Sequence, residues 1–491
     1  MVYGLTKGYR PQGAPVASHL LCSGWVRVKA AVLRLALLAL KRPSRLQEIR
    51  ADLNHGCATV RDMWTKPFAT MAVLVSVGGS VVAPSVLQGA VSELGLGKPA
   101  ILQSLLRAGR AEAAPCSTLP NPVVVTGATS AEPLVKQVAR LLAREDATPM
   151  TVVWQLKNSC SGVEAVVKDT QPGSCAAGAC AFGKAKFWTL DPRDLDPKEC
   201  DLETRGTKAD LAVSDVFPQT CPVFAGAQLT GILDIPGPVS AYALLGAKQS
   251  TEGAMHAEEG HFVFGVGKSA GVTPWVNDNA LLLLGDQFAG QLLLAQQTKL
   301  PPGRWKGALV KDDSELLTSL YNDTQASVGI LPTTLLDSRR AAVRVLAFQA
   351  RGQRGAFYPD RKNSSFEKQN VRDGHYPLWG YMHMILRQDP GMPTQPLSVR
   401  GGRLAEILLG RKVVASKDPV LLQVQSGLVP QCAMKVSRQS DQGPLQPLLN
   451  SEPCGCWFEK NVMGGLLGCQ ECPDGKTCTV GTCRKNFCEV Q

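Results

Sequence analysis

The chain lacks the residue patterns that mark the common enzyme classes. Its 491 residues include six histidines, and no Ser–His–Asp set, no pair of carboxylates at motif spacing and no nucleotide-binding fingerprint stands out. Residues 265–269 (Gly-Val-Gly-Lys-Ser) look like a phosphate loop, but Phe262 stands where that motif needs a glycine. We therefore expect a protein that is not an enzyme and that carries no cofactor.

Most of the chain also lacks an excess of charge of one sign. Residues 1–113 hold 14 Lys and Arg against 5 Asp and Glu, whereas the remaining 378 residues hold 38 against 36. The net charge of +11 therefore belongs almost entirely to the N-terminal quarter. Because the rest is nearly neutral, we expect no nucleic-acid partner.

The N-terminal quarter has the layout of an export signal. A basic start after Met63 is followed by an uncharged stretch rich in Ala, Val, Ser and Gly over residues 67–92, and then by Ala111-Glu112-Ala113. This order predicts an export signal over 63–113, cleaved after Ala113, and a periplasmic or extracellular protein. Residues 1–62 are predicted to be an extension without a fold, with Met63 as the true start. The alternative is a retained N-terminal anchor, which would be the chain's sole membrane attachment.

Cysteine is missing from the whole centre of the chain, between Cys221 and Cys432. The 14 cysteines after Ala113 form two even sets, which predicts two separate groups of disulfides in an oxidising compartment, with the pairing left open. The alternative for Cys454-x-Cys456 and Cys469-x2-Cys472 is zinc, but export favours disulfides, so we expect no metal. The two sets are Cys116, Cys160, Cys175, Cys180, Cys200 and Cys221, and Cys432, Cys454, Cys456, Cys469, Cys472, Cys478, Cys483 and Cys488.

Between residues 121 and 424, short β-branched runs alternate with helical stretches, which predicts an α/β fold with largely parallel sheets in two lobes joined by two crossovers. The expected strands are 123–125, 151–155, 211–213, 240–245, 327–331 and 344–349. The expected helices are 133–144, 162–167, 257–264, 290–297, 313–321 and 381–387. The expected domains are the first part of lobe 1 (117–237), lobe 2 (238–345), the return of lobe 1 (346–430) and a small cysteine-rich tail (431–491) that depends on cross-links.

Three turns between a strand and a helix have the composition of anion sites. In residues 123–134, Thr129 and Ser130 add hydroxyl donors to the free N–H groups of a helix start. Thr129 and Glu132 also fit a capping box, so the alternative is a well-capped helix that binds nothing.

The other two turns bring Ser161 and Asp215. Residues 151–164 end a strand in Ser-Cys-Ser-Gly, and residues 209–217 end one in Ser-Asp. Asp215 could accept a hydrogen bond from a ligand that carries a proton, such as hydrogenphosphate but not sulfate. Its alternative is an ordinary turn or cap residue.

These turns resemble those of the phosphate-type periplasmic solute-binding proteins of ABC transporters, over residues 120–425. The resemblance rests on residues 126–134, 159–163 and 209–217 and on Tyr376-Pro377-Leu378. It implies a two-lobed fold that closes over an oxyanion, with Thr129, Ser130, Ser161 and Asp215 on the first lobe's side. The chain is more closely similar to a subgroup of exported bacterial proteins with a cysteine-rich tail and the residues Asn-Val-Arg-Asp-Gly-His-Tyr-Pro, here 370–377.

The second lobe departs from that family. Its usual Arg and Ser-Gly-Thr turn corresponds here to residues 284–291, where Gly290 is retained but the Arg and both hydroxyl residues are absent, and Asp286 adds a negative charge. Losing a charge-assisted bidentate contact should weaken phosphate binding severely.

Two histidine groups are weaker candidates. His256 and His261 are spaced unlike a zinc helix and fit a helix surface better. His375 and His383 lie among polar residues and are expected to brace a loop rather than to bind a ligand directly.

The sequence therefore predicts capture of a small oxyanion by lobe closure, for an ABC importer or for sensing. The alternative is a structural or interaction protein that lost the ligand and uses the tail as its contact surface.

Overall fold

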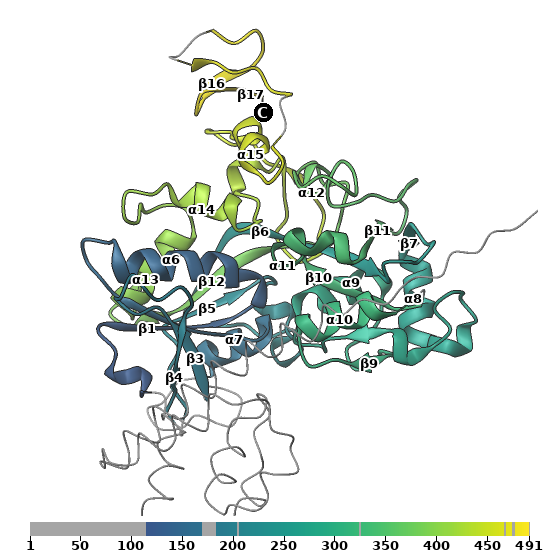
Figure 1. Ribbon diagram of the computed structural model, residues 1–491, viewed down its shortest axis with the longest axis horizontal. Helices are drawn as coiled ribbons and strands as arrows, with labels where there is room; N and C mark the ends of the chain where they lie inside the picture. Colours follow the sequence, from purple (N-terminus) through teal and green to yellow (C-terminus); the bar gives the residue numbers. More distant parts are fainter. Residues whose placement is uncertain are drawn as a thin grey trace, which may run out of the picture. The chain divides into compact units, whose positions relative to one another are not determined.

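The computed structural model describes residues 114–168, 183–203, 206–323, 326–465, 468–473 and 477–490, which belong to one compact unit (Figure 1). The predicted extension over 1–62 and export signal over 63–113 lie outside the described residues, as do Cys175 and Cys180. Within the described ranges, each helix is too short or too polar to span a lipid bilayer.

The first lobe is built on three parallel strands with β1 in the middle. Their Val, Leu and Ala side chains are buried on both faces, which is why these strands read as short continuous apolar runs. The antiparallel strands β3 and β4 continue the sheet beyond β2. The bounds are β1 (Pro122–Gly127), β2 (Thr151–Leu156), β3 (Lys184–Phe187), β4 (Lys198–Asp201) and β5 (Leu211–Ser214).

Helices pack on both faces of this sheet and fix where its strands end. The buried side chains of α6, α13 and α14 join the strands in one apolar cluster. A Cβ on Gly162 of α7 would lie 2.5 Å from the Cα of Gly127, so this helix approaches the end of β1 at backbone contact. The bounds are α6 (Glu132–Arg144), α7 (Ser159–Val167), α13 (Val399–Leu408) and α14 (Pro419–Gln425).

The second lobe is built on the other end of the same sheet, with α8, α9, α10 and α11 packed around it. The last part of β6 pairs with β10 and β11, and β11 pairs in parallel with β7, while β8 and β9 form a separate pair. In Figure 1 these elements lie to the right of the first lobe. The bounds are β7 (Ala254–His256), α8 (Ala257–Val266), β8 (Leu282–Leu283), α9 (Ala289–Thr298), β9 (Ala308–Leu309), α10 (Asp313–Asn322), β10 (Val328–Pro332), α11 (Thr333–Leu336) and β11 (Arg344–Gln349).

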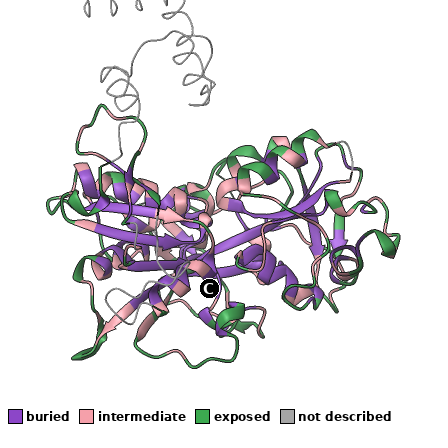
Figure 2. Cartoon of the chain, turned by 90° about the horizontal axis from the view of Figure 1, so that it is seen from below, coloured by how far each residue is buried: buried purple, intermediate pink, exposed green. Residues whose placement is uncertain are grey.

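Two long strands, β6 (Ile232–Gly246) and β12 (Trp379–Asp389), connect the lobes and pair with each other in antiparallel fashion. β12 also pairs with β5 and, beyond Arg387, with β13 (Met392–Pro396). Figure 2 shows buried residues following the central strands through both lobes. The predicted helix over 381–387 is wrong, because these residues form β12. Residues 379–386 are buried on both faces, and a short apolar run of this kind carries no period that separates helix from strand.

Strand pairing also bears on the expected division of the chain. β11, where the first lobe was expected to resume, pairs with the second-lobe part of β6 and with β7. The first-lobe pairing resumes at β12. The four domain boundaries stay predictions, and the pairing places β11 itself, residues 344–349, beside strands of the second lobe.

The cysteine-rich tail contains α15 (Gly455–Asn461) and the hairpin of β16 (Thr482–Arg484) and β17 (Phe487–Glu489). The twelve described cysteines form six disulfides, and none joins the first set to the second. Cys454, Cys456, Cys469 and Cys472, the residues weighed as zinc ligands, are all disulfide-bonded. The bridges are Cys116–Cys200, Cys160–Cys221, Cys432–Cys454, Cys456–Cys469, Cys472–Cys483 and Cys478–Cys488. The predicted two-lobed α/β fold with a disulfide-rich C-terminal segment is thus confirmed.

Candidate functional site

The three predicted turns meet at one edge of the first-lobe sheet. Because β1, β2 and β5 are parallel, their carboxyl ends lie together. These ends lead into Thr129 and Ser130, into Asn158 and Ser159, and into Asp215. The sequence therefore located the edge of the sheet where polar side chains gather.

Asp215 is the centre of this group and is fully buried. Its Oδ2 accepts hydrogen bonds from the Ser130 hydroxyl and from the Tyr242 hydroxyl of β6. Its backbone N–H donates to Oγ of Ser159 over 3.1 Å. One oxygen of the carboxylate expected to accept a ligand's proton thus binds two hydroxyls of the chain itself.

Burial raises the pKa of Asp215, and the hydrogen bonds from Ser130 and Tyr242 offset part of that rise. Burial, together with the neighbouring carboxylate of Asp215, raises the pKa of Tyr242 well above its ordinary value. The phenol therefore keeps its proton and acts as the donor. Oδ1 of Asp215 has no hydrogen-bond partner among the described residues.

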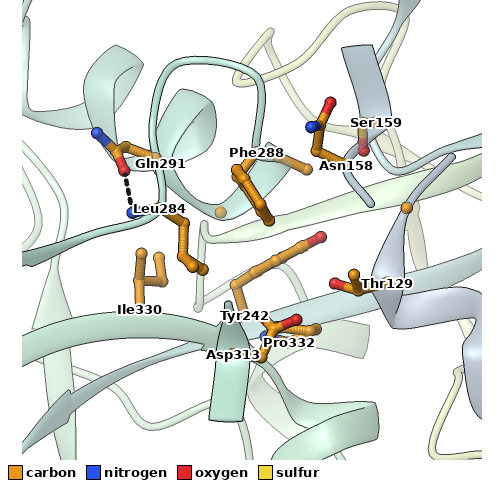
Figure 3. Close-up of a pocket in the computed structure, with 13 residues that line it drawn as sticks. Thr129, Asn158, Ser159, Tyr242, Leu284, Phe288, Gln291, Asp313, Ile330 and Pro332 are labelled. Atoms are coloured by element: carbon orange, nitrogen blue, oxygen red, sulfur yellow. Dashed lines mark hydrogen bonds between the residues drawn. The ribbon is translucent and has the colours of Figure 1, made fainter. Parts of the chain in front are cut away.

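A pocket lies between the two lobes in front of this group, and it is almost filled. Its free volume is about 10 Å³, which is room for about one water molecule. Figure 3 shows the Tyr242 ring lying across the pocket between Phe288 and Pro332. The lining residues are Ala128, Thr129, Asn158, Ser159, Tyr242, Leu284, Phe288, Ala289, Gly290, Gln291, Asp313, Ile330 and Pro332.

Gly290 makes room for that ring. A Cβ at this position would lie 2.6 Å from Cδ1 of Tyr242 and 3.0 Å from Cε1, which are closer than carbon atoms approach. The retained glycine therefore lets a side chain of the protein pack against the start of α9.

The second-lobe turn uses its polar groups internally. Oε1 of Gln291 accepts from the backbone N–H of Leu284 at 3.0 Å (Figure 3). It also accepts from the backbone N–H of Gly285 at 2.9 Å. Asp286 accepts from the N–H of Gly303 at 2.6 Å and from the indole N–H of Trp305 at 2.7 Å. The negative charge of Asp286, expected to oppose a ligand, is thus bound within its own lobe.

One further hydrogen bond crosses the pocket. The backbone N–H of Cys160 at the start of α7 donates to the carbonyl of Gln287 over 3.2 Å. Asp313 at the start of α10 lines the pocket opposite Thr129, and burial raises the pKa of Asp313 to about 6. The bonds from Cys160 to Gln287 and from Tyr242 to Asp215 join the two walls of the pocket.

The predicted site residues fall into three positions. Thr129 and Gly290 line the pocket, whereas Ser130 and Asp215 lie behind Tyr242. The Ser161 hydroxyl donates to the Asn158 carbonyl over 3.2 Å and does not line the pocket.

Sequence reasoning missed other lining residues. Asn158 caps α7 and accepts from the N–H of Ser161 at 2.8 Å, so a capping residue directly after β2 was an available signal. Tyr242 gave no such signal, because it lies within an apolar strand. The predicted capping box of Thr129 and Glu132 does not form, because the chain enters α6 through a short 3₁₀ turn whose flanking residues make no side-chain cap.

The histidines have structural partners. Nδ1 of His383 lies 2.6 Å from Oδ1 of Asp234, and His375 stacks on Phe357. His256 forms a capping box with Glu259 at the start of α8. None of these histidines lines the pocket between the lobes.

No protein-family model matches the chain, and comparison with curated proteins finds no match. Among solved structures, the chain is similar to an ABC-type phosphate transport receptor from Vibrio cholerae (12% identity, TM-score 0.41, covering 63% of this chain and 100% of that one). It is also similar to a phosphate ABC transporter substrate-binding protein with bound phosphate from Clostridium perfringens (9%, 0.39, 63% and 99%). A third is the OxyR regulatory domain from Pseudomonas aeruginosa (11%, 0.29, 54% and 87%).

Proposed function

We propose that this protein keeps a two-lobed binding fold but captures no oxyanion, and that it is a structural or interaction protein whose cysteine-rich tail is the contact surface. The observation that carries the proposal is Tyr242. Its hydroxyl donates a hydrogen bond to the carboxylate of Asp215. Its ring lies in the pocket between the lobes, whose free volume is only about 10 Å³. A phosphate ion has five heavy atoms and needs several times that space.

The charges around the pocket support the same conclusion. Asp313 is the only lining residue that is charged at neutral pH, since the pKa of its carboxyl is about 6. An anion in the pocket would meet this carboxylate and no Arg or Lys. The helix starts facing the pocket favour an anion, but their contribution is small beside a lost charge-assisted bidentate contact.

The tail supports the second half of the proposal. Four of the six described disulfides lie within the tail. Met463, Val480 and Val490 of the tail expose half or more of their surface. We propose a periplasmic or extracellular location, because a disulfide-rich segment is typical of oxidising surroundings.

Oxyanion capture for an ABC importer or for sensing is the second candidate. It is favoured by the pairing of Ser130 with Asp215 at the ends of parallel strands, and by the resemblance to phosphate-type binding proteins. It requires Tyr242 to leave Asp215, so that a protonated oxyanion could take the place of the phenol.

Titration calorimetry with phosphate and sulfate separates the two candidates. The wild type should give no saturable heat. The triple variant Leu284→Arg, Ala289→Ser, Gln291→Thr returns the missing groups, and it also releases the N–H groups that Gln291 holds. Leu284 is the better position for Arg, because Gly285 has φ +102° and resists a side chain. Saturable phosphate binding by the wild type that Asp215→Asn abolishes would contradict the proposal and establish the second candidate.

A further inference from the structure

Residues 431–450, here called the strap, follow the last first-lobe helix and touch both lobes. Asp441 makes the contact with the first lobe. Its Oδ2 accepts from the backbone N–H of Phe217 and from the Thr220 hydroxyl, each at 2.7 Å. Phe217 and Thr220 lie just after β5, and Asp441 is only 8% exposed. The carboxylate is thus a buried anchor on the first lobe.

The next residue of the strap contacts the second lobe. Oε1 of Gln442 accepts from Nε2 of Gln297 in α9 at 2.5 Å. Its own Nε2 donates to the carbonyl of Pro377, before β12, at 3.0 Å. The adjacent residues Asp441 and Gln442 therefore bind opposite lobes. Gln442 also binds the segment before β12.

The strap also covers the strands that connect the lobes. The Arg438 guanidinium stacks on Trp379 of β12, 3.7 Å from the ring centre. The backbone N–H of Arg438 donates to the hydroxyl of Tyr381. Nε2 of Gln431 donates to the carbonyls of Pro236 and Gly237 in β6. Bending at these strands would change the distances that the strap spans.

Residues 370–377, which carry the resemblance to the exported subgroup, contact the strap and the tail through Arg372. Nε of Arg372 donates to the Ala433 carbonyl at 2.9 Å, and its Nη1 donates to Glu459 of the tail at 2.8 Å. The disulfide between Cys432 and Cys454 ties the strap to α15. From the same stretch, the Tyr376 hydroxyl donates to the carbonyl of Tyr242 at 2.7 Å.

We propose that the strap is a clamp that fixes the two lobes in the closed position. Opening the cleft would carry α9 away from the turn after β5. Since Asp441 and Gln442 are adjacent, they cannot follow both elements, and opening must break the hydrogen bonds of one of them. The inference rests on the proposed function in one respect, namely that closure needs no ligand.

Hydrogen exchange in the full chain tests the clamp. The Cys160 amide reports closure, because it donates to Gln287 across the cleft. The Ala128 amide, which donates to Val213 within the first lobe, reports overall stability. We expect Asp441→Ala to speed exchange at Cys160 about tenfold while Ala128 is unchanged. Gln442→Ala should have a smaller effect in the same direction. Gln439→Ala, at an exposed strap position, should leave both amides at wild-type rates.

Three results would overturn the clamp: wild-type exchange at Cys160 in both variants, an equal rise at Cys160 and Ala128, or faster exchange in Gln439→Ala. If Asp441→Ala does not fold, Gln442→Ala decides alone, because its side chain is only partly buried. Phosphate binding by the wild type would contradict the proposed function but would leave this comparison of variants intact.

Discussion

The two walls of the pocket differ in what their polar groups do. On the first lobe, Ser130 and Asp215 keep the composition of an anion site, but they bind each other and Tyr242. On the second lobe, Leu284, Phe288 and Ala289 present apolar surface to the pocket. The side-chain oxygen of Gln291 accepts from backbone N–H groups of the preceding turn. A strand-to-helix turn therefore binds a ligand only if its donors and acceptors are not already satisfied within the chain.

The largest effect is expected from removing the side chain that joins the walls. Tyr242→Ala deletes a buried ring and leaves Asp215 without one of its donors, so we expect unfolding free energy to fall by about 3–5 kcal/mol. Urea unfolding measures this. Tyr321→Ala, at a residue 59% exposed, is the matched control and should change little. Similar losses in both variants would mean that Tyr242 has no special role.

The second effect is a pH dependence of the unfolding free energy, caused by Asp313 of the second lobe. Because the pKa of this carboxyl is raised from 3.8 to about 6 in the folded protein, its protonated form favours folding. Its contribution is present below pH 4 and is lost as the pH rises through 6, by about 2–3 kcal/mol. Asp313→Asn should flatten this part of the pH–stability curve. An unchanged curve in the variant would show that Asp313 is not the group responsible.

Gly290→Ala tests whether the second wall is shaped around Tyr242. The new methyl group would push into the ring, and we expect a loss of about 1–3 kcal/mol. Gly253→Ala is the control, because no atom lies within 4 Å of a Cβ there. If the loss at Gly290 disappears in a Tyr242→Ala background, the ring is its cause; a loss that persists there would have another origin.

The smallest effect concerns the turn of the second wall. Gln291→Leu removes the acceptor for two backbone N–H groups and should cost about 1–2 kcal/mol. Gln291→Glu keeps an acceptor and should retain most of the stability. Equal losses in the two variants, measured by urea unfolding, would indicate that the hydrogen bonds contribute nothing.

The sequence predicted what depends on local pattern. The runs that became β1, β2 and β5 are short and apolar and end in turn residues, so their positions followed from the chain itself. Residues 381–387 were misassigned, because a strand buried on both faces carries no alternation. The role of Tyr242 could not be predicted, because its partner Asp215 lies 27 residues away and only the sheet order, in which β12 lies between β5 and β6, brings them together.

The contacts of the strap could not be predicted from the sequence either. Asp441 and Gln442 stand in a polar stretch without a motif, and their partners lie more than 60 residues away. Long-range contacts of this kind leave no periodicity in one sequence. The resemblance in residues 370–377 pointed to a shared feature, but not to its use as an anchor for the strap.

We propose that the protein's own side chains close the lobes. The exchange rate of the Cys160 amide in the wild type, measured without and with phosphate, is the decisive measurement. Slow exchange that phosphate leaves unchanged is the predicted result. Fast exchange without phosphate, followed by protection when phosphate is added, would show that the cleft opens and closes on an oxyanion and would contradict the account.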